Sequence, residues 1–174
     1  MMKHLLVPLD GSELAEEALL IAGNLAEALD AEITLVRIVP PPVPGRFYAP
    51  NLLEQMQEAQ AKEAEAYLAS VAKRLADDRL SKVSTHVLTG EAATTIIRFV
   101  NQHACDLIVM GSHGLGGVGW HVFGSVAQKV LHSSACPVLI VRPKGEEWER
   151  EEELEEQDTD RTLLSELRGG SRES

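Results

Sequence analysis

Four residues in the second half of the chain have the types and the spacing to bind a phosphate group. Gly111 and Gly114 follow an apolar run at residues 106–110, and Gly124 and Ser125 precede a helical pattern, which gives the spacing G-x2-G-x9-G-S. Glycine has no Cβ, so the backbone at such positions can come close to a ligand. The free N–H groups and the positive dipole end of the following helix attract an anion, and the Ser125 hydroxyl can add a donor. The segment therefore predicts a phosphate-binding loop.

The same segment contains a second pattern, G-x-G-x-x-G at residues 114–119. A dinucleotide-binding motif belongs in the first strand–helix unit and is followed by an acidic residue about 20 positions later. Here the pattern follows the fourth predicted strand, and residues 133–142 contain no Asp or Glu. We interpret this pattern as a coincidence of a glycine-rich turn.

Short apolar runs alternate with helical patterns along the chain. Helices are predicted where apolar residues recur at steps of three and four. Strands are expected over residues 4–9, 32–39, 82–88, 106–110 and 137–141, and helices over residues 14–29, 52–75, 93–100 and 126–131. Each connection is long enough to carry a helix, so neighbouring strands should be parallel. The prediction is an α/β fold, a single doubly wound domain with a five-stranded parallel sheet and helices on both faces.

Ligands of such sheets bind beyond the carboxyl ends of the strands. Four segments should lie at that edge: Pro8 to Asp10, Ile38 to Pro40, Thr89 to Gly90, and the glycine-rich loop. In the first of them, Asp10-Gly-Ser12 forms a turn in which Ser12 can cap the next helix.

The charge is distributed unevenly. The net charge is −11, and residues 145–174 hold twelve acidic and four basic side chains, leaving a net of −3 on residues 1–144. No part of the chain is basic enough for electrostatic binding of nucleic acid. We expect one domain over residues 1–144 and an acidic tail over residues 145–174. The tail is expected to be disordered or to form a short helix that docks on the domain or on a partner.

Nothing in the sequence predicts a membrane protein. No apolar stretch reaches the roughly 18 residues of a membrane span, and the N-terminus meets a proline and an aspartate too early for a signal peptide. The two cysteines, Cys105 and Cys136, are expected to be buried, reduced thiols. A cytoplasmic protein is the expectation.

Signals of catalysis are weak. Ser112 and His113 adjoin, but neighbouring side chains usually point apart, and there is no G-x-S-x-G elbow. The histidines lack metal-ligand spacing, and no paired carboxylates end the strands. We predict no catalytic residues.

Several motifs together resemble one family. The segments LLVPLDGS, CDLIVMG and GSVAQKVLHSSACPVLIVRP, together with G-x2-G-x9-G-S, are similar to the universal stress proteins over nearly all of residues 3–143. The ATP-binding branch of that family carries the glycine motif. The resemblance implies a Rossmann-like sheet of strand order 3-2-1-4-5 and a homodimer that pairs through the last strand, Pro137 to Arg142.

The resemblance also implies a role for each site residue. Pro8, Leu9 and Asp10 would meet the ribose and adenine, although Asp10 could also be only a turn residue. Ile38 would line the adenine pocket through its backbone. The remaining residues would flank the nucleotide or meet its phosphates: Met110, Gly111, Ser112, His113, Gly114, Gly124, Ser125 and Val126.

One feature departs from a strong phosphate site, since the loop from Leu115 to Phe123 contains no Lys or Arg. Backbone N–H groups, the helix dipole and His113 or His121 would have to hold the phosphates. Charge-assisted hydrogen bonds are about twice as strong as neutral ones, so we expect Mg²⁺ or Mn²⁺ to contribute, held through the phosphates and not by protein ligands alone.

Two classes of function remain open from the sequence. The first is an ATP-binding regulatory stress-response protein that acts through nucleotide-dependent conformation or through an unidentified protein partner. The second is a partner-binding stress protein without nucleotide. A slow ATPase is a further alternative.

Overall fold

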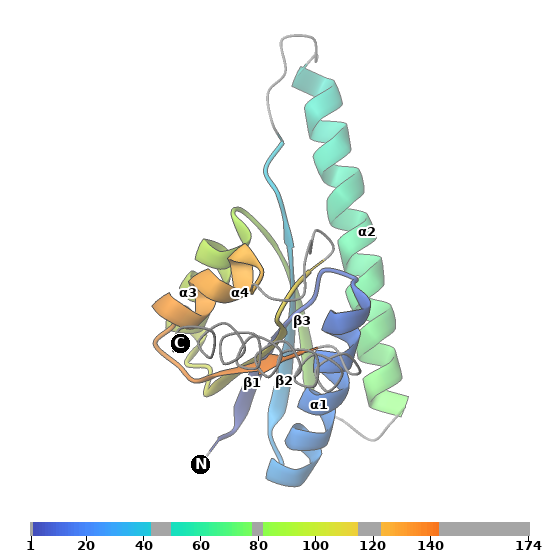
Figure 1. Ribbon diagram of the computed structural model, residues 1–174. Coiled ribbons are helices and arrows are strands. Elements are labelled where there is room, and N and C mark those ends of the chain that lie inside the picture. Colours follow the sequence, from blue (N-terminus) through green and yellow to red (C-terminus); the bar gives the residue numbers. More distant parts are fainter. Residues whose placement is uncertain (1, 43–49, 78–81, 115–122, 143–174) are drawn as a thin grey trace, which may run out of the picture. The chain divides into compact units, whose positions relative to one another are not determined.

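The computed structural model describes residues 2–42, 50–77, 82–114 and 123–142. Strands and helices alternate along them, as labelled in Figure 1. The strands are β1 (His4–Pro8), β2 (Glu32–Val39), β3 (Val83–Thr89), β4 (Leu107–Gly111) and β5 (Val138–Val141). The helices are α1 (Glu13–Leu29), α2 (Pro50–Asp77), α3 (Ala92–His103) and α4 (Ser125–Ser133). Most of the proline-rich loop, most of the glycine-rich loop and the predicted acidic tail lie outside the described residues.

Within the described residues, the five strands form one sheet in the order β3-β2-β1-β4-β5. Every neighbouring pair is parallel. The central strand β1 pairs Leu5 with Ile33 of β2 on one side and with Leu107 of β4 on the other. The predicted fold class and strand order are therefore confirmed. The order reverses between β1 and β4, which is where doubly wound sheets bind ligands.

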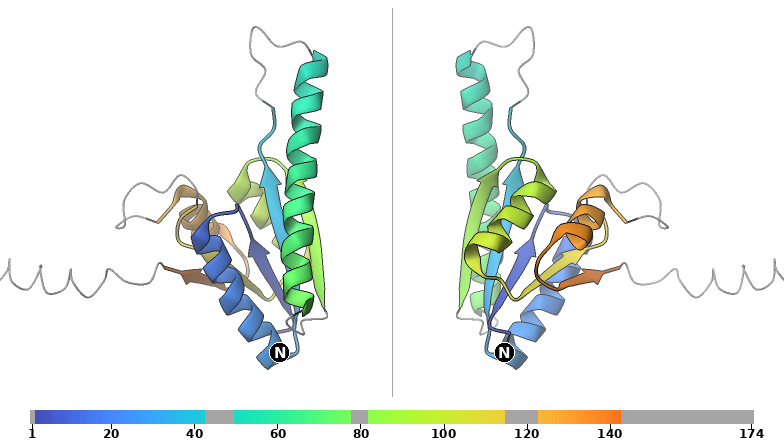
Figure 2. Two further views of the ribbon diagram at one scale, coloured as in Figure 1. Left: turned by 90° about the vertical axis from the view of Figure 1, so that its right-hand side faces the viewer. Right: turned by 90° about the vertical axis from the view of Figure 1, so that its left-hand side faces the viewer.

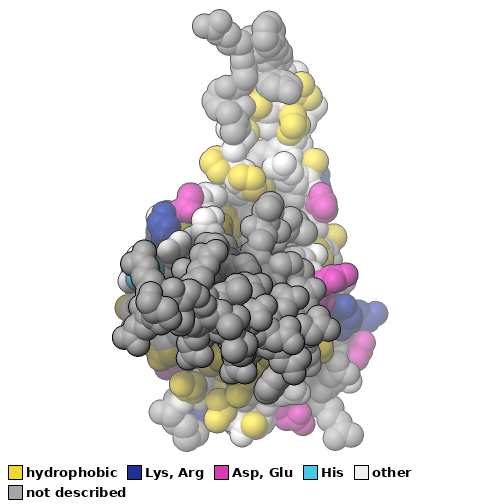
Figure 3. All heavy atoms as spheres, viewed as in Figure 1, with side chains coloured by type: hydrophobic (Ala, Val, Ile, Leu, Met, Phe, Trp, Pro, Cys, Tyr) yellow, Lys and Arg dark blue, Asp and Glu magenta, His cyan; other side chains and the backbone are white. Residues whose placement is uncertain are grey.

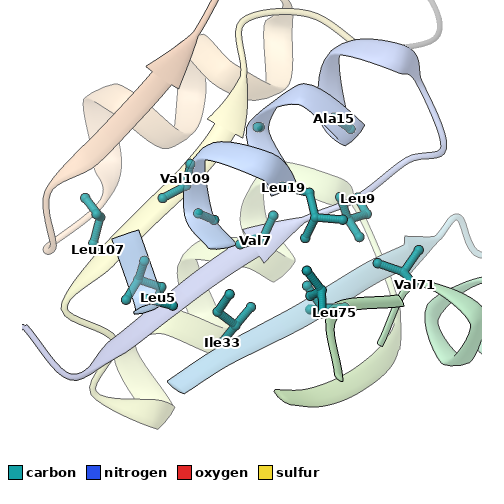
Figure 4. Packing of buried hydrophobic residues seen from close by; sticks show 14 of the residues in the cluster. Leu5, Val7, Leu9, Ala15, Leu19, Ile33, Val71, Leu75, Leu107 and Val109 are labelled. Carbon is teal, nitrogen blue, oxygen red and sulfur yellow. The ribbon is translucent and has the colours of Figure 1, made fainter. Parts of the chain in front are cut away.

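Helices cover both faces of this sheet, α1 and α2 on one face and α3 and α4 on the other (Figures 1 and 2). Alternate residues of each strand face opposite sides, so the sheet contributes to two apolar cores. The core under α1 and α2 is shown in Figure 4 and includes Leu5, Val7, Ala18, Leu19, Ile33, Leu35, Leu68, Val71 and Val109. The core under α3 and α4 includes Leu6, Val36, Ala93, Ile96, Phe99, Ile108, Met110, Ala127 and Val130.

Three helix starts at the carboxyl edge of the sheet are capped in different ways. The Ser12 hydroxyl accepts the N–H of Ala15 at 3.2 Å, which confirms Ser12 as the cap of α1. The cap of α3 is Glu91, and hydrogen bonds from the Thr94 hydroxyl and the Lys129 ammonium lower the pKa of Glu91 to about 2. Helix α4 has Gly124 at its N-cap, and this residue has no side chain to cap the helix.

The described surface is not uniformly polar. The N-terminal half of α2 extends past the sheet (Figure 1), and apolar side chains are visible along it in the upper part of Figure 3. Two apolar residues of this helix, Leu52 and Met56, are each more than 40% exposed. No helix among the described residues is both long and apolar enough to cross a membrane.

Both cysteines are free thiols. Cys105 is buried, and burial raises the pKa of its thiol to about 11, so it stays protonated. Cys136 is only partly buried, so the expectation of two buried thiols is wrong for this residue. It lies two residues before β5, the strand at the edge of the sheet, beyond which the described residues contain no further strand.

Candidate functional site

A cavity of about 490 Å³ opens at the carboxyl-terminal edge of the sheet. It lies where β1, β2 and β4 end and where α3 and α4 begin. All twelve residues predicted from the sequence line it: Pro8, Leu9, Asp10, Ile38, Met110, Gly111, Ser112, His113, Gly114, Gly124, Ser125 and Val126. The structure thus brings the predicted residues to one place, and their ligand remains a prediction.

Five further lining residues were not predicted: Ala15, Ala92, Ile96, Phe123 and Ala127. Four of them come from helices, and their apolar type gave no chemical signal. The segment at 92–96 could have been suspected, because it follows the strand end at Thr89–Gly90 that was placed at the same edge. Phe123 could have been suspected from its position next to Gly124.

Apolar side chains form one part of the lining. Ile96, Met110 and Ala127 are buried in the core under α3 and α4, and Ile38 and Ala92 lie beside them in the cavity wall. These residues come from four different elements, β2, α3, β4 and α4. Such a wall suits a flat ring with apolar faces, such as an aromatic base, because burial of those faces away from water is favourable.

The polar part of the lining begins with Asp10. Its Oδ1 accepts the Ser12 backbone N–H at 3.0 Å and the Ser12 hydroxyl at 2.6 Å. The same hydroxyl oxygen of Ser12 accepts the N–H of Ala15 and so starts α1. Asp10 is therefore both the turn residue and a residue of the cavity wall, so the two readings of Asp10 from the sequence are compatible.

The glycines of the motif allow protein segments to pack closely against one another. A Cβ on Gly114 would lie 2.2 Å from Oδ2 of Asp10, and one on Gly111 would lie 2.9 Å from Cγ of Leu14. A Cβ on Gly124 would lie 3.2 Å from the Ser112 carbonyl oxygen. The sequence predicted close approach to a ligand at Gly111 and Gly114. The structure shows a close approach to other parts of the protein at both positions.

The start of α4 forms another part of the wall. The Gly124 N–H donates to the Ser112 carbonyl at 2.8 Å, and the Gly124 carbonyl accepts the N–H of Gln128 at 2.9 Å. Ser125, Val126 and Ala127 of the first turn line the cavity. The N–H groups of a first turn lack partners within their own helix, and the helix dipole adds positive potential. This end of the cavity therefore favours an anion.

The adjacent pair Ser112 and His113 differs from the sequence expectation. The Ser112 hydroxyl lies 2.9 Å from Nδ1 of His113, so the two side chains are hydrogen-bonded. The expectation that they point apart is wrong, because β4 ends at Gly111 and the alternation of side chains in a strand ends with it. Ser112 is 1% exposed, and its N–H donates to the carbonyl of Val141 in β5. The Ser112 hydroxyl is therefore placed to orient the His113 ring at the cavity.

The lining of the cavity offers few charged groups for metal or phosphate binding. Within the described residues, no group of three or more His, Cys, Asp or Glu side chains could hold a metal ion. The lining of the cavity includes one carboxylate, Asp10, and one imidazole, His113, but no Lys or Arg. Residues 115–122 of the glycine-rich loop, with His121, lie outside the described residues.

Comparison with known proteins agrees with the fold. The sequence model of the universal stress protein family matches residues 1–142. The chain belongs to the universal stress protein family. A universal stress protein of Methanocaldococcus jannaschii is 34% identical over 145 residues, which cover 83% of this chain and 85% of the relative.

Solved structures of the family share this fold. The universal stress protein UspA from Lactobacillus plantarum aligns with a TM-score of 0.72 and 26% identity, covering 80% of this chain and 97% of that one. A family member from Arabidopsis thaliana, solved with AMP bound, aligns with a TM-score of 0.62 over 83% of this chain and 94% of that one. At 16% identity, the latter similarity establishes the fold alone.

The contact between Gly114 and Asp10 makes a testable prediction. Replacing Gly114 by Ala should lower the free energy of unfolding by about 1–3 kcal/mol, as overpacking does, because the new methyl group displaces the Asp10 carboxylate. Among the described glycines only Gly11 and Gly90 have positive φ, so the cost at Gly114 is a matter of space. Urea denaturation would measure it.

A double-mutant cycle provides the control. In an Asp10→Ala background the carboxylate is absent, so adding the methyl group at Gly114 should cost less by about 0.5–3 kcal/mol. If the two substitutions are additive, the proposed clash does not limit position 114.

Proposed function

We propose that this chain is an ATP-binding regulatory member of the universal stress protein family. The observation that carries the proposal is the cavity at the carboxyl edge of the sheet. It joins an apolar wall, the Asp10 carboxylate and the start of α4 within about 490 Å³. Cavities of roughly 300–1,000 Å³ are typical of small-molecule sites. Occupancy of this cavity by ATP would regulate the conformation of the protein or its binding to a protein partner.

Each part of a nucleotide has a suitable counterpart in the lining. Adenine would lie against Ile38, Ile96 and Met110, which exclude water from its faces. A carboxylate accepts hydrogen bonds, so Asp10 would accept them from the ribose hydroxyls. The phosphates would face the first turn of α4, where backbone N–H groups and the helix dipole stabilise negative charge. The AMP-bound Arabidopsis protein gives a precedent for an adenine nucleotide on this fold.

A second candidate function rests on the glycines. Because Gly111 and Gly114 are explained by their packing against Leu14 and Asp10, the motif does not by itself require a phosphate. A partner-binding stress protein without nucleotide would need the same glycines. Nucleotide extracted from protein that was purified without added ATP would favour the first function, and its absence together with no binding in titration would favour the second. Release of phosphate on incubation with ATP would identify a slow ATPase.

The start of α4 gives the first test. Gly124→Val places a branched side chain where a Cβ already lies 3.2 Å from the Ser112 carbonyl oxygen and 3.3 Å from Cα of His113. We expect this variant to lose retained nucleotide, because the side chain occupies the space between the helix start and the phosphates. The loss of a favourable cap residue and the tight backbone contacts should together cost about 1–3 kcal/mol of stability, and circular dichroism would check that the variant folds.

The matched control is Ser133→Val, which adds a valine at the exposed far end of α4. It should retain nucleotide as the wild type does. Retention of nucleotide by Gly124→Val would show that the site has been misplaced.

A divalent cation is the second element of the proposal. Since no Lys or Arg lines the described cavity, Mg²⁺ or Mn²⁺ bound through the phosphates should supply positive charge. Chelation with EDTA should weaken ATP binding about tenfold or more, measured by calorimetric titration. Adenosine, which has no phosphates, should bind equally with and without EDTA. Equal ATP affinity under both conditions would refute the role of the cation.

The third element is a homodimer through Pro137 to Arg142. Strand β5 is at one edge of the described sheet and pairs only with β4 there. Its Leu139 is 36% exposed, and Leu131 of α4 is 45% exposed. An apolar edge strand in water tends to pair with another chain.

Light scattering at micromolar concentrations should therefore give the mass of a dimer, and Leu139→Lys should shift the mass toward that of a monomer. Leu20→Lys, at the 67% exposed position of α1, should leave the dimer intact. A monomeric wild type across this range would exclude the dimer.

A further inference from the structure

The cavity has little positive charge for a ligand as anionic as ATP. Among the described lining residues, His113 is the one side chain that can become cationic. A triphosphate carries several negative charges, and hydrogen bonds from a cationic donor are about twice as strong as those from a neutral one. A cationic side chain at the phosphate end would therefore make a large difference to binding.

Arg142 follows β5 directly, at the carboxyl-terminal end of the sheet, where the cavity also opens. Side chains alternate along β5: Val138 and Ile140 pack with the core under α3 and α4, whereas Val141 packs with the core under α1 and α2. Strand β5 and its alternation end at Val141, so the position of the Arg142 side chain follows from its own contacts. The carbonyl of Val141 also accepts the N–H of Ser112, a lining residue, so Arg142 begins next to the cavity wall.

An aromatic ring positions the guanidinium group. Cζ of Arg142 lies 5.2 Å from the centroid of the Phe123 ring, within the roughly 6 Å range of a cation–π interaction. Phe123 is itself a lining residue and immediately precedes Gly124, the cap of α4. The cation is therefore held beside the helix start that already favours an anion. Arg142 is exposed, and arginine keeps its charge at all ordinary pH values.

We propose that Arg142 binds the phosphate chain of the ligand and that Phe123 positions it. This inference rests on the proposed nucleotide site and specifies how that site distinguishes ligands. A guanidinium can stack one face on a ring while its edge donates two parallel hydrogen bonds to phosphate oxygens. Arg142 thereby favours ligands with a phosphate chain over the bare nucleoside.

Calorimetric titration of adenosine, AMP and ATP against four proteins tests this role. Arg142→Gln should weaken ATP binding about tenfold and leave adenosine binding unchanged. Arg142→Lys keeps the charge but loses the planar group, so its ATP affinity should fall between those of the wild type and Arg142→Gln. The control is Arg98→Gln, which removes another exposed arginine, on α3, and should bind as the wild type does. Neither arginine is a lining residue of the cavity, but Arg142 contacts the lining residue Phe123. Light scattering on each variant would show that its oligomeric state is unchanged.

The possible failures can be told apart. If Arg142→Gln binds ATP as tightly as the wild type does, the role of Arg142 is refuted while the nucleotide site stands. If Arg142→Gln loses adenosine and ATP affinity equally, the residue supports the fold of the site and does not contact phosphates, which also refutes the role. If the wild type binds neither adenosine nor ATP, the nucleotide site itself is refuted, and the role of Arg142 with it.

Discussion

The parallel direction of all the neighbouring strands is the constraint on which the candidate site depends. In a parallel sheet, every connection must return from the carboxyl end of one strand to the amino end of the next. The carboxyl ends of the strands and the turns that follow them therefore gather on the same side of the sheet. Asp10, Ile38 and Gly111 are far apart in sequence and meet there because each lies within two residues of the carboxyl end of a parallel strand. The cavity is a consequence of this arrangement, and its chemistry comes from the few side chains that the turns present.

Close packing between two of these turns adds a second layer of organisation. Asp10 starts α1 through Ser12, and its other carboxylate oxygen occupies the space that a Cβ on Gly114 would need. With a side chain at position 114, the Asp10 carboxylate would have to move from its present place. The same glycine motif thus serves the fold and the candidate site together, and an explanation by ligand binding alone would be incomplete.

Much of this could be predicted from the sequence, because apolar periodicity and glycine spacing are local signals. The strand and helix positions followed from them, and the strand ends located the polar residues of the cavity. What the sequence did not reveal depends on contacts between distant segments. The helical pattern predicts that Ala92, Ile96 and Ala127 lie in helices, but it does not show that these helices border the cavity. The contact of Arg142 with Phe123 likewise joins two distant segments, the end of β5 and the residues just before α4. The contact between Ser112 and His113 was missed because strand alternation was extended past the end of β4.

Ser112 has a further consequence through its backbone. Its carbonyl accepts the N–H of Gly124, and its N–H donates to Val141 of the edge strand. The backbone of Ser112 thus connects the N-cap residue of α4 to the edge strand of the sheet, through two hydrogen bonds and no flexible side chain. A ligand that displaced the start of α4 would also move β5, and any partner that fixed β5 would in turn alter the affinity of the cavity, since such coupling is reciprocal. Such coupling between the cavity and the edge strand β5 would require no hinge and no rearrangement of the core.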